Sequence, residues 1–451
     1  MGWAEDFVER VEKRDLVIGV VGLGYVGLPT ALGFFSSGFK IWGVEESKSK
    51  ISDLSNQRNP IKESKYDDLI PNSEDSRWNI TNSFSEAIPI CDVVIVTVPT
   101  PVTSDKRIDT SHVVDAGKSI FCNISPGSRT IVILESTVYP GLTRDLWTPI
   151  LEENGLVTGE DVELAYCPER YSPGLETMSI EDISRIVGAQ NPSVGSSIVS
   201  LYEKITNSDV TFVGEIEVAE SAKLIENVQR DINIALVNEL AIILPKLGVD
   251  IEDVLEAASS KWNFHRYTPG LGVGGHCIPV DPYFLIDQAQ LNNSPVNLIS
   301  SGRKINSSMP SHVASEIRGI LQKFGIPIEG AKILILGWSY KPGIGDDRGS
   351  PSRELSIELY RLGVQIFCLD PYVDESSFPK FVTPISDFQS SNHYDMLVVA
   401  TAHNEFMGLN WDLIKNSMQN PILYDSRRCL QLLPLEKMGW NVFALGKPES
   451  P

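Results

Sequence analysis

The sequence lacks the features that mark several large classes of protein. It has no run of about 18 apolar residues of the kind that crosses a membrane. Its 38 lysines and arginines are outnumbered by 59 aspartates and glutamates, which gives a formal net charge of -21. Because nucleic acids require basic patches, we expect no nucleic-acid partner, although a few convergent cations can still hold a small anion. The N-terminal segment, residues 1–15, is charged and amphipathic rather than signal-like, so we expect a cytoplasmic protein without a membrane partner.

Cysteine is also scarce, and the spacing of the cysteines does not match a metal-binding motif. The six cysteines are scattered along the chain without a CxxC pair, so the sequence predicts neither a zinc site nor a disulfide framework, and we expect no metal. Hydrophobic residues at 42% and charged residues at 22% are typical of a globular protein. A chain of 451 residues has room for two or three domains.

Glycine, in contrast, is concentrated in one stretch, residues 269–285, which reads PGLGVGGHCIPVDPYFL. Glycine permits backbone conformations with positive φ and lets a ligand approach the main chain, so such a run indicates that the backbone lines a site. Cys277 follows the glycines and Asp281 comes four residues later, which makes Cys277 a candidate nucleophile. The alternative is a flexible loop with an apolar, buried thiol, since free cysteine is common in protein cores.

A dinucleotide-binding fingerprint follows the first predicted strand, residues 17–21. The run 22–27 reads GLGYVG, opens a predicted helix and is followed about 20 residues later by Glu45, at the end of a second strand. The glycines would let pyrophosphate approach the helix N-terminus, and Glu45 would bind the adenosine ribose and repel a 2′-phosphate. We therefore expect NAD rather than NADP; the alternative is a tight strand-to-helix turn without a cofactor. The candidate cofactor contacts here are Gly22, Gly24, Tyr25, Val26, Gly27 and Glu45.

Further strands of this domain are apolar throughout. The runs 92–98 and 130–134 lack the alternation of a half-exposed strand, which indicates a parallel sheet buried on both faces. Ligands of such sheets lie beyond the carboxyl ends of the strands. The candidate cofactor residues that follow these strands are Pro99, Thr100, Ser136 and Thr137, and Thr100 and Thr137 could each equally be an ordinary strand-end cap. A strand at 163–166 leads to Glu169, a candidate catalytic acid, with Cys167 expected in the core.

The middle of the chain is helical, and its last third repeats the opening pattern. In the predicted long helix 215–247, Lys223 and Asn227 are four residues apart and share a face, although a solvated lysine is the default interpretation. Strands 332–337 and 364–369 then form a second βαβ unit without the glycine fingerprint. The predicted fold is α/β: two Rossmann-like, doubly wound parallel-sheet domains joined by a helical central domain with a long helix. We predict domain boundaries at 15–212, 213–312 and 313–451.

Eight motifs together resemble one family, the UDP-glucose/GDP-mannose dehydrogenases, over residues 16 to about 445. They occur in the family's order: GLGYVGLP, VTVPTP, ESTVYPG, YCPER, the Lys223/Asn227 helix face, GVGGHCIPVDP, YKPGIGDDRGSPS and DSRR. GGHCIPVDP in place of GGSCFPKD resembles the branch that acts on UDP-N-acetylhexosamines, and YCPERYSPG is closer to its UDP-N-acetylmannosamine members. GIGDDRGSP departs from the more usual NVDDxRESP at Gly345 and Gly349.

The resemblance implies a reaction, which we state as an expectation. The C6 primary alcohol of a UDP-N-acetylhexosamine, in the first instance UDP-N-acetyl-D-mannosamine, is oxidised twice to a carboxylate with two NAD+, through a thiohemiacetal and a thioester on a cysteine. The alternatives within the family are UDP-N-acetylglucosamine, then UDP-glucose or GDP-mannose. A non-catalytic nucleotide-sugar binder on the same fold is the alternative from another class.

The resemblance also implies site residues. Cys277 would be the nucleophile, Lys223 would stabilise the oxyanion at C6, and Glu169 would be the base for thioester hydrolysis. Asn227 would hold a water or the C6 oxygen, and Asp281 would orient Lys223 or water and take part in proton transfer. Thr137 would position the water. The implied substrate contacts are Glu169, Arg170, Lys223, Asn227, Arg266, Gly274, Gly275, Arg303, Tyr340 and Lys341, with Arg348 assigned to UDP, sugar or cofactor. Arg303 would reach the diphosphate and Arg266 a dimer interface, and the family's long central helix implies a homodimer.

Overall fold

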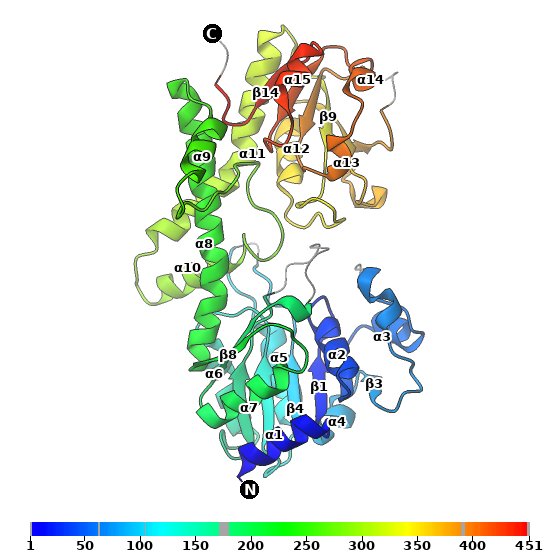
Figure 1. Ribbon diagram of the computed structural model, residues 1–451, viewed down its shortest axis with the longest axis vertical. Helices are drawn as coiled ribbons and strands as arrows, with labels where there is room; N and C mark the ends of the chain where they lie inside the picture. The colour runs from blue at the N-terminus through cyan, green and yellow to red at the C-terminus, as the bar shows by residue number, and fades with distance from the viewer. Residues whose placement is uncertain (1, 62–63, 104, 171–179, 389–392, 449–451) are drawn as a thin grey trace. The chain divides into compact units, whose positions relative to one another are not determined.

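The computed structural model describes residues 2–61, 64–103, 105–170, 180–388 and 393–448 (Figure 1). Residues 171–174 of the YCPERYSPG motif lie outside this set. The chain forms two compact units, one of residues 1–226 with 283–288 and the other of residues 227–282 with 289–451. Helices α8 (Ile216–Ile243) and α10 (Asp281–Leu291) contribute residues to both units.

The first unit is built on an eight-stranded sheet in the order β3-β2-β1-β4-β5-β6-β7-β8. Its strands are β1 (Val17–Val21), β2 (Lys40–Val44), β3 (Trp78–Thr81), β4 (Val93–Val96), β5 (Thr130–Leu134), β6 (Val162–Tyr166), β7 (Arg185–Ala189) and β8 (Val210–Gly214). All neighbouring strands run parallel except β6 and β7, which are antiparallel. The order reverses between β1 and β4, which is where ligands bind in open sheets of this type.

Helices cover both faces of this sheet, as a doubly wound fold requires. Helices α1 (Trp3–Lys13), α2 (Gly27–Ser36) and α7 (Pro192–Tyr202) bury apolar side chains on one face, and α1 lies against α7 (Figure 1). Helices α5 (Ser111–Phe121) and α6 (Leu142–Glu153) cover the other face. The remaining helices are α3 (Lys48–Ser55) and α4 (Phe84–Ala87). Every residue of β4 and β5 is buried, as their continuous apolarity predicts.

The second unit contains a six-stranded, wholly parallel sheet in the order β11-β10-β9-β12-β13-β14. Its strands are β9 (Lys332–Leu336), β10 (Gln365–Leu369), β11 (Val382–Pro384), β12 (Met396–Val399), β13 (Ile422–Asp425) and β14 (Asn441–Ala444). Helices α9 (Ile251–Ser259), α11 (Asn297–Lys323) and α12 (Pro351–Arg361) share one core with it. Helices α13 (Asn404–Met407), α14 (Trp411–Lys415) and α15 (Leu432–Lys437) lie on its other face.

The predicted fold class is confirmed, and the differences lie at edges and ends. The antiparallel strand β7 and the edge strands β3, β8, β11 and β14 are not among the strands named from the sequence. The predicted helix 215–247 is shorter as an α-helix: α8 ends at Ile243 and continues as a 3-10 turn because Pro245 cannot donate to an earlier carbonyl. The short 3-10 segments are η1 (Ser64–Leu69), η2 (Ile88–Ile90), η3 (Ile180–Asp182), η4 (Leu244–Leu247) and η5 (Glu375–Ser377).

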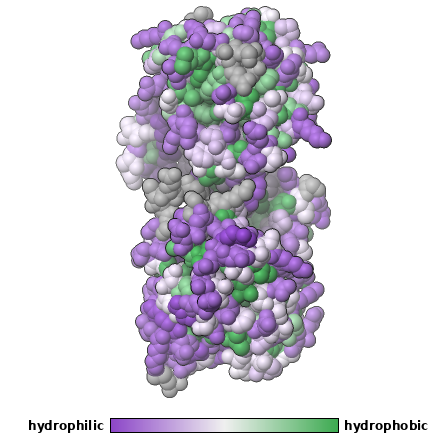
Figure 2. Space-filling model, turned by 90° about the vertical axis from the view of Figure 1, so that its right-hand side faces the viewer, coloured by the Kyte–Doolittle hydropathy of each residue, from purple (hydrophilic) through white to green (hydrophobic). Residues whose placement is uncertain are grey.

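Hydrophilic residues cover most of the face in view in Figure 2, with apolar residues in small groups among them. Within the described parts of the chain, no single helix is long and apolar enough to cross a membrane; one helix pair, Ile216–Leu247 with Ile251–Ser259, passes that test jointly but is bent by 119°.

Candidate active site

The loop between β1 and α2 has the geometry that a dinucleotide requires. Gly22 has a φ of +91°, and its N–H donates to the carbonyl of Val44 at 2.8 Å, which sets the tight turn. A Cβ on Gly27 would collide with the carbonyl oxygen of Gly22. A Cβ on Gly24 would meet nothing within 4 Å, so the backbone there is open to a ligand at the N-terminal end of α2. These residues therefore fit the pyrophosphate of NAD.

Glu45 lies at the end of β2 and is 8% exposed. Its Oε2 accepts hydrogen bonds from the Leu23 N–H at 2.9 Å and from Lys50 Nζ at 3.1 Å, and its Oε1 accepts one from the Ser47 N–H at 3.0 Å. Burial favours the protonated form, but these hydrogen bonds and the Lys50 charge outweigh it and lower the pKa of Glu45. Glu45 is therefore an anion that holds the glycine loop, and its Oε1, which accepts one hydrogen bond, keeps a lone pair with which to accept a ribose hydroxyl.

The ends of β4 and β5 are joined by side-chain hydroxyls. Thr100 Oγ1 donates to the carbonyl of Thr137 at 2.8 Å, and Ser136 Oγ donates to the carbonyl of Val98 at 2.6 Å. The structure thus brings together Thr100, Ser136 and Thr137 at the carboxyl edge of the sheet, and Pro99 directly precedes Thr100. Thr100 thus joins the ends of the two strands, as its alternative interpretation as a strand-end cap expected, and Ser136 makes a second such bond. Contact of either residue with a cofactor stays a prediction.

Glu169 lies just beyond β6 and is 7% exposed. Its Oε2 accepts a hydrogen bond from Arg185 Nη2 at 2.5 Å, and its Oε1 accepts one from the Arg170 N–H at 2.7 Å. The Arg170 guanidinium is engaged with Glu226, at 2.8 Å, and with the carbonyl of Ser184, at 2.8 Å. Sequence reasoning missed Arg185, because an arginine that opens a strand normally marks the surface, and only the fold shows that this one is 2% exposed.

In the second unit, the glycine-rich segment packs directly on the segment after β9. A Cβ on Gly274 would lie 2.6 Å from Cβ of Tyr340. Gly275 has a φ of +83°, and its N–H donates to the carbonyl of Arg348 at 3.0 Å. Burial, followed by the charge of Asp346, raises the pKa of Tyr340 to about 12, so its hydroxyl keeps its proton. Four predicted substrate or cofactor residues, Gly274, Gly275, Tyr340 and Arg348, are therefore neighbours.

Cys277 is half-buried and begins the turn that leads into α10. Its carbonyl accepts hydrogen bonds from the N–H groups of Val280, at 3.0 Å, and of Asp281, at 2.8 Å. Asn227 Nδ2 on α8 donates to Asp281 Oδ2 at 2.6 Å, and these two side chains are 8% and 2% exposed. The polar face of α8 is thus bonded to the segment that carries the cysteine. Lys223, one helical turn before Asn227, is 9% exposed.

A buried amide network supports the start of the glycine-rich segment. The Gly270 N–H donates to Asn238 Oδ1 at 2.9 Å, and Asn238 Nδ2 donates to Asn306 Oδ1 at 2.9 Å. Asn306 Nδ2 and Arg303 Nη1 both donate to Asp231 Oδ1, at 2.8 Å and 2.5 Å. Arg303 is 7% exposed and has Asp231 as its counterion, which gives it a structural role. Its contact with a diphosphate stays a prediction.

The other predicted ligand-binding cations of this unit, Arg266, Arg348 and Lys341, have different neighbours. Arg266 is ion-paired with Glu252, and Arg348 donates to Asp346 at 2.9 Å. Burial, and then the positive charge of Arg230, lowers the pKa of Lys341. Arg230 was not singled out from the sequence, although it lies one turn beyond Asn227 on α8.

Arg427, in the DSRR motif, is a further cation that the sequence reasoning did not assign. A Cβ on Gly270 would collide with its guanidinium, so the two groups are in contact. Burial is the first cause that lowers the pKa of Arg427, with the charges of Cys429 and Asp425 opposing it. Its position beside the glycine-rich segment is what only the fold could show.

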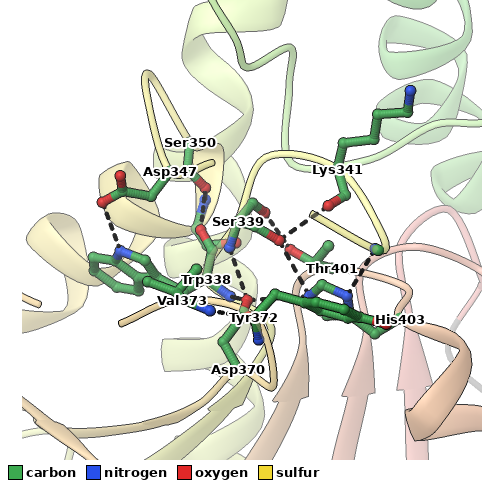
Figure 3. Close-up of polar contacts among 12 residues, drawn as sticks. Trp338, Ser339, Lys341, Asp347, Ser350, Asp370, Tyr372, Val373, Thr401 and His403 are labelled. Carbon is green, nitrogen blue, oxygen red and sulfur yellow. Dashed lines mark hydrogen bonds and ion pairs between the residues drawn. The ribbon is translucent and has the colours of Figure 1, made fainter. Parts of the chain in front are cut away.

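The segment that carries Tyr340 and Lys341 is clamped by one carboxylate, Asp370 (Figure 3). Asp370 Oδ2 accepts hydrogen bonds from the N–H groups of Trp338, at 2.6 Å, and Ser339, at 2.9 Å. Burial disfavours its charge, but these bonds and that from His403 outweigh burial and lower the pKa of Asp370 to about 2. Asp370 is therefore a permanent anion at the end of β10.

His403, after β12, completes the clamp (Figure 3). The Gly343 N–H donates to its Nδ1 at 3.1 Å, so the ring hydrogen is on Nε2, which lies 3.1 Å from Asp370 Oδ2. The Ser339 hydroxyl donates to the carbonyl of Lys341 at 3.0 Å. Both ends of the 338–343 segment are thereby fixed to the carboxyl edge of the second sheet.

Comparison with known proteins gives these sites a family. Three domain models of the UDP-glucose/GDP-mannose dehydrogenase family match: the NAD binding domain at residues 16–206, the central domain at 217–308 and the UDP binding domain at 334–432. The chain belongs to this family. The predicted NAD-dependent dehydrogenase, its cofactor and its fold class are thereby confirmed.

Three relatives illustrate the similarity. A UDP-N-acetyl-D-glucosamine 6-dehydrogenase of Pseudomonas aeruginosa is 37% identical over 421 residues, 92% of this chain and 98% of that protein. A UDP-N-acetyl-D-mannosamine dehydrogenase of Methanococcus maripaludis is 31% identical over 95% of this chain and 96% of that protein. A solved structure of a UDP-D-ManNAc dehydrogenase from Pyrococcus horikoshii covers 96% of this chain and 100% of its own, with 31% identity and a TM-score of 0.86.

Proposed function

We propose that this dehydrogenase oxidises C6 of a UDP-N-acetylhexosamine from alcohol to carboxylate, with Cys277 as the nucleophile. The balanced reaction consumes the alcohol, one water and two NAD+, and yields the carboxylate, two NADH and three protons. The observation that carries it is the 2.6 Å hydrogen bond from Asn227 to Asp281, which ties the polar face of α8 to the segment of Cys277. A loop that merely contained an apolar thiol would have no need of a buried amide–carboxylate pair beside it.

NAD+, when bound, would supply the hydride acceptor for each of the two oxidations. In the first, Lys223 stabilises the developing alkoxide at C6 with its ammonium group. The Cys277 sulfur then adds to the aldehyde carbon, its proton leaves, and the oxygen becomes the alkoxide from which the second hydride departs. Cys277 lies four residues before α10, and its carbonyl accepts the N–H of Asp281, the first residue of that helix.

Hydrolysis of the thioester completes the reaction. Water adds to the carbonyl carbon, Glu169 takes its proton, and the carbon–sulfur bond breaks as Cys277 leaves as a thiolate. Asn227, Asp281 and Thr137 are assigned to orient the water and the C6 oxygen. Tyr340, Lys341, Arg266 and Arg303 remain proposed contacts for the nucleotide sugar, and the position of Arg427 against Gly270 adds one cation to that group.

Two epimers are candidates for the sugar. The motif YCPERYSPG and the fold similarity to a mannosamine dehydrogenase favour UDP-N-acetylmannosamine. The 37% identity with a glucosamine 6-dehydrogenase favours UDP-N-acetylglucosamine, the alternative stated from the sequence.

The test is the initial rate of NADH formation with UDP-ManNAc, UDP-GlcNAc, UDP-GalNAc, UDP-glucose and GDP-mannose as separate substrates. We expect kcat/KM for one N-acetylhexosamine to exceed that for UDP-glucose by at least 100-fold, since a site built for the N-acetyl group is left with unpaired polar groups without it. A preference for UDP-glucose or GDP-mannose would contradict the branch assignment. No NADH from any of the five would favour a non-catalytic binder.

Assembly and location complete the proposal. We place the domain boundaries at 15–212, 213–312 and 313–451, with a homodimer formed through α8 in the cytoplasm. Support for the dimer comes from four exposed apolar side chains on α8 at intervals of 7, 11 and 7 residues, which share one face of a helix with 3.6 residues per turn. They are Val218, Ile225, Leu236 and Ile243, each 45% to 57% exposed.

A further inference from the structure

Behind Glu169 lies a buried cluster of charges that the proposed reaction does not yet use. Arg185 Nη2 donates to Glu169 Oε2 at 2.5 Å, and Arg185 Nη1 donates to Glu135 Oε1 at 3.3 Å. The side chains of Arg185 and Glu135 are 2% and 0% exposed. One guanidinium thus stands between two carboxylates, at the carboxyl ends of β5 and β6, away from solvent.

The cluster contains two glutamates, Glu135 and Glu169, and one arginine, Arg185. It is electrically neutral when one of the two glutamates is protonated. Around Glu135 stand Arg185 from β7, Glu169 and Cys167 from the segment after β6, Tyr202 from α7 and Thr30 from α2. The Tyr202 hydroxyl donates to Glu135 Oε1 at 2.6 Å, and Thr30 Oγ1 donates to Glu135 Oε2 at 3.3 Å.

Burial decides which of these groups are neutral. It raises the pKa of Cys167 to about 12 and that of Tyr202 well above its ordinary value, so both keep their protons. Burial, opposed by Arg185 and reinforced by the charge of Glu169, raises the pKa of Glu135 to about 7. Near neutral pH, Glu135 can therefore hold or release a proton, which an ordinary buried ion pair cannot do.

We propose that Arg185 and Glu135 are positioning residues for Glu169. The Arg185 guanidinium fixes the Glu169 carboxylate, and Glu135 replaces Glu169 as the counterion of Arg185 when Glu169 takes a proton. This inference rests on the proposed role of Glu169 as the base in thioester hydrolysis.

The physical reason lies in the cost of an unpaired buried charge. When water adds to the thioester carbonyl and its proton moves to Glu169, Arg185 loses the anion that stands 2.5 Å from it. A guanidinium left without a counterion away from solvent is strongly destabilised, so proton transfer to Glu169 requires another anion beside Arg185. Glu135 therefore releases its proton, which leaves to solvent as one of the three protons that the reaction yields. Its carboxylate, which already accepts from Tyr202 and Arg185, then keeps the guanidinium paired.

The test separates oxidation from hydrolysis in the full-length enzyme with its preferred UDP-sugar. Glu135→Gln should leave the burst of two NADH per active site at the wild-type rate, because both hydride transfers precede hydrolysis. The steady-state rate should fall at least tenfold, in keeping with the usual contribution of a general base. Acid-quenched enzyme should carry the acyl group on Cys277, detected as a mass increase of the intact chain. Glu135→Asp, which keeps a carboxylate, should recover part of the steady-state rate.

A matched control removes another buried carboxylate from the same sheet. Glu163 on β6 is 4% exposed and pairs with Arg129 at 3.0 Å, and within the described residues it makes no hydrogen bond or ion pair with Glu169. Glu163→Gln should therefore show wild-type steady-state turnover and no acyl-enzyme. If Glu135→Gln does not fold, Tyr202→Phe is the second variant, since loss of its hydrogen bond disfavours ionised Glu135 and should also accumulate acyl-enzyme.

Three results would overturn the inference. The first is wild-type turnover of Glu135→Gln without acyl-enzyme. The second is loss of both the NADH burst and the steady-state rate in Glu135→Gln, which indicates a merely structural role. The third is as much acyl-enzyme in the Glu163→Gln control as in Glu135→Gln. Failure of the proposed function looks different, because wild-type enzyme would then form no NADH with any UDP-sugar.

Discussion

At the scale of single residues, burial and hydrogen bonding set the charge of acids that have similar side chains. Glu45 and Glu135 are both glutamates at the carboxyl end of a strand in the same sheet. Glu45 accepts two backbone N–H groups and faces Lys50, and its pKa is lowered. Glu135 is more deeply buried, faces a second carboxylate, and its pKa is raised to about 7. The first is suited to hold a loop as a permanent anion, and the second is suited to change its charge.

The raised pKa of Glu135 predicts a specific dependence of stability on pH. Its folded-state pKa of about 7 exceeds the ordinary value of 4.5, so the folded chain binds this proton more tightly than the unfolded chain. The stabilisation from protonated Glu135 is complete below about pH 4.5 and is lost as the pH rises through about 7. Relative to wild type, Glu135→Gln should gain up to about 3 kcal/mol between pH 5 and 8, measured as the free energy of unfolding in urea. If the free energies of unfolding of the two proteins changed with pH by the same amount over this range, the prediction would be wrong.

Residue identity alone indicates several candidate site residues and cannot indicate others. Cys277, Asp281 and Asn227 are visible in the sequence because they belong to motifs with fixed spacing. Arg185 belongs to no such motif, and its contact with Glu169 joins positions 16 residues apart through an antiparallel pair of strands. Spacing along the chain cannot indicate such a partner.

At the scale of elements, the ends of parallel strands position the site segments. Asp370, at the end of β10, accepts five hydrogen bonds or ion-pair contacts from the segments after β9, β10 and β12. The sequence predicted β9 and β10 as the strands of a second βαβ unit. It did not predict the clamp, because an Asp-Pro pair after a strand is equally typical of an ordinary turn.

Replacement of Asp370 tests the clamp. Asp370→Asn removes the charge that the N–H groups of Trp338 and Ser339 and the His403 ring share, and should lower the free energy of unfolding by about 3 kcal/mol. Because the same segment carries Lys341, the KM for the UDP-sugar should rise about tenfold with a smaller change in kcat. Steady-state kinetics and urea unfolding measure both effects. The matched control is Asp374→Asn, which alters an exposed acid in the next turn.

The pH dependence of this clamp has the opposite sign from that of Glu135. The folded-state pKa of Asp370, about 2, is below the ordinary value of 3.8, so its stabilisation is present above about pH 4 and is lost as the pH falls towards 2. If Asp370→Asn left both stability and KM unchanged at neutral pH, the segment would be held by other contacts and the clamp would be irrelevant to the sugar.

At the scale of the whole molecule, the chain combines an NAD binding domain, a central domain and a UDP binding domain. The order of elements predicted this fold, since strand–helix alternation occurs twice around a helical middle. The edge strands β3, β8, β11 and β14 were not predicted because they are three to five residues long and less apolar than the central strands. Assembly belongs to the same scale, and α8 is the element that carries the proposed dimer.

The exposed apolar face of α8 predicts the effect of one charge on assembly. Leu236 is 54% exposed, and Leu236→Glu should convert a dimer to a monomer because a buried, unpaired carboxylate opposes association. Light scattering after size-exclusion chromatography gives the mass of each species. Leu413→Glu, at a 66% exposed leucine on α14, is the matched control and should remain dimeric. A monomeric wild-type protein across micromolar concentrations would contradict the proposed dimer.

The central claim is a four-electron oxidation through Cys277, and the stoichiometry of NADH tests it most directly. With limiting UDP-N-acetylhexosamine and excess NAD+, wild-type enzyme should form two NADH for each uronate, with no free aldehyde. Cys277→Ser should lower the rate of uronate formation at least 1,000-fold, since removal of a covalent nucleophile has an effect of this order. One NADH per sugar in the wild type, or two NADH at an undiminished rate in Cys277→Ser, would contradict the account.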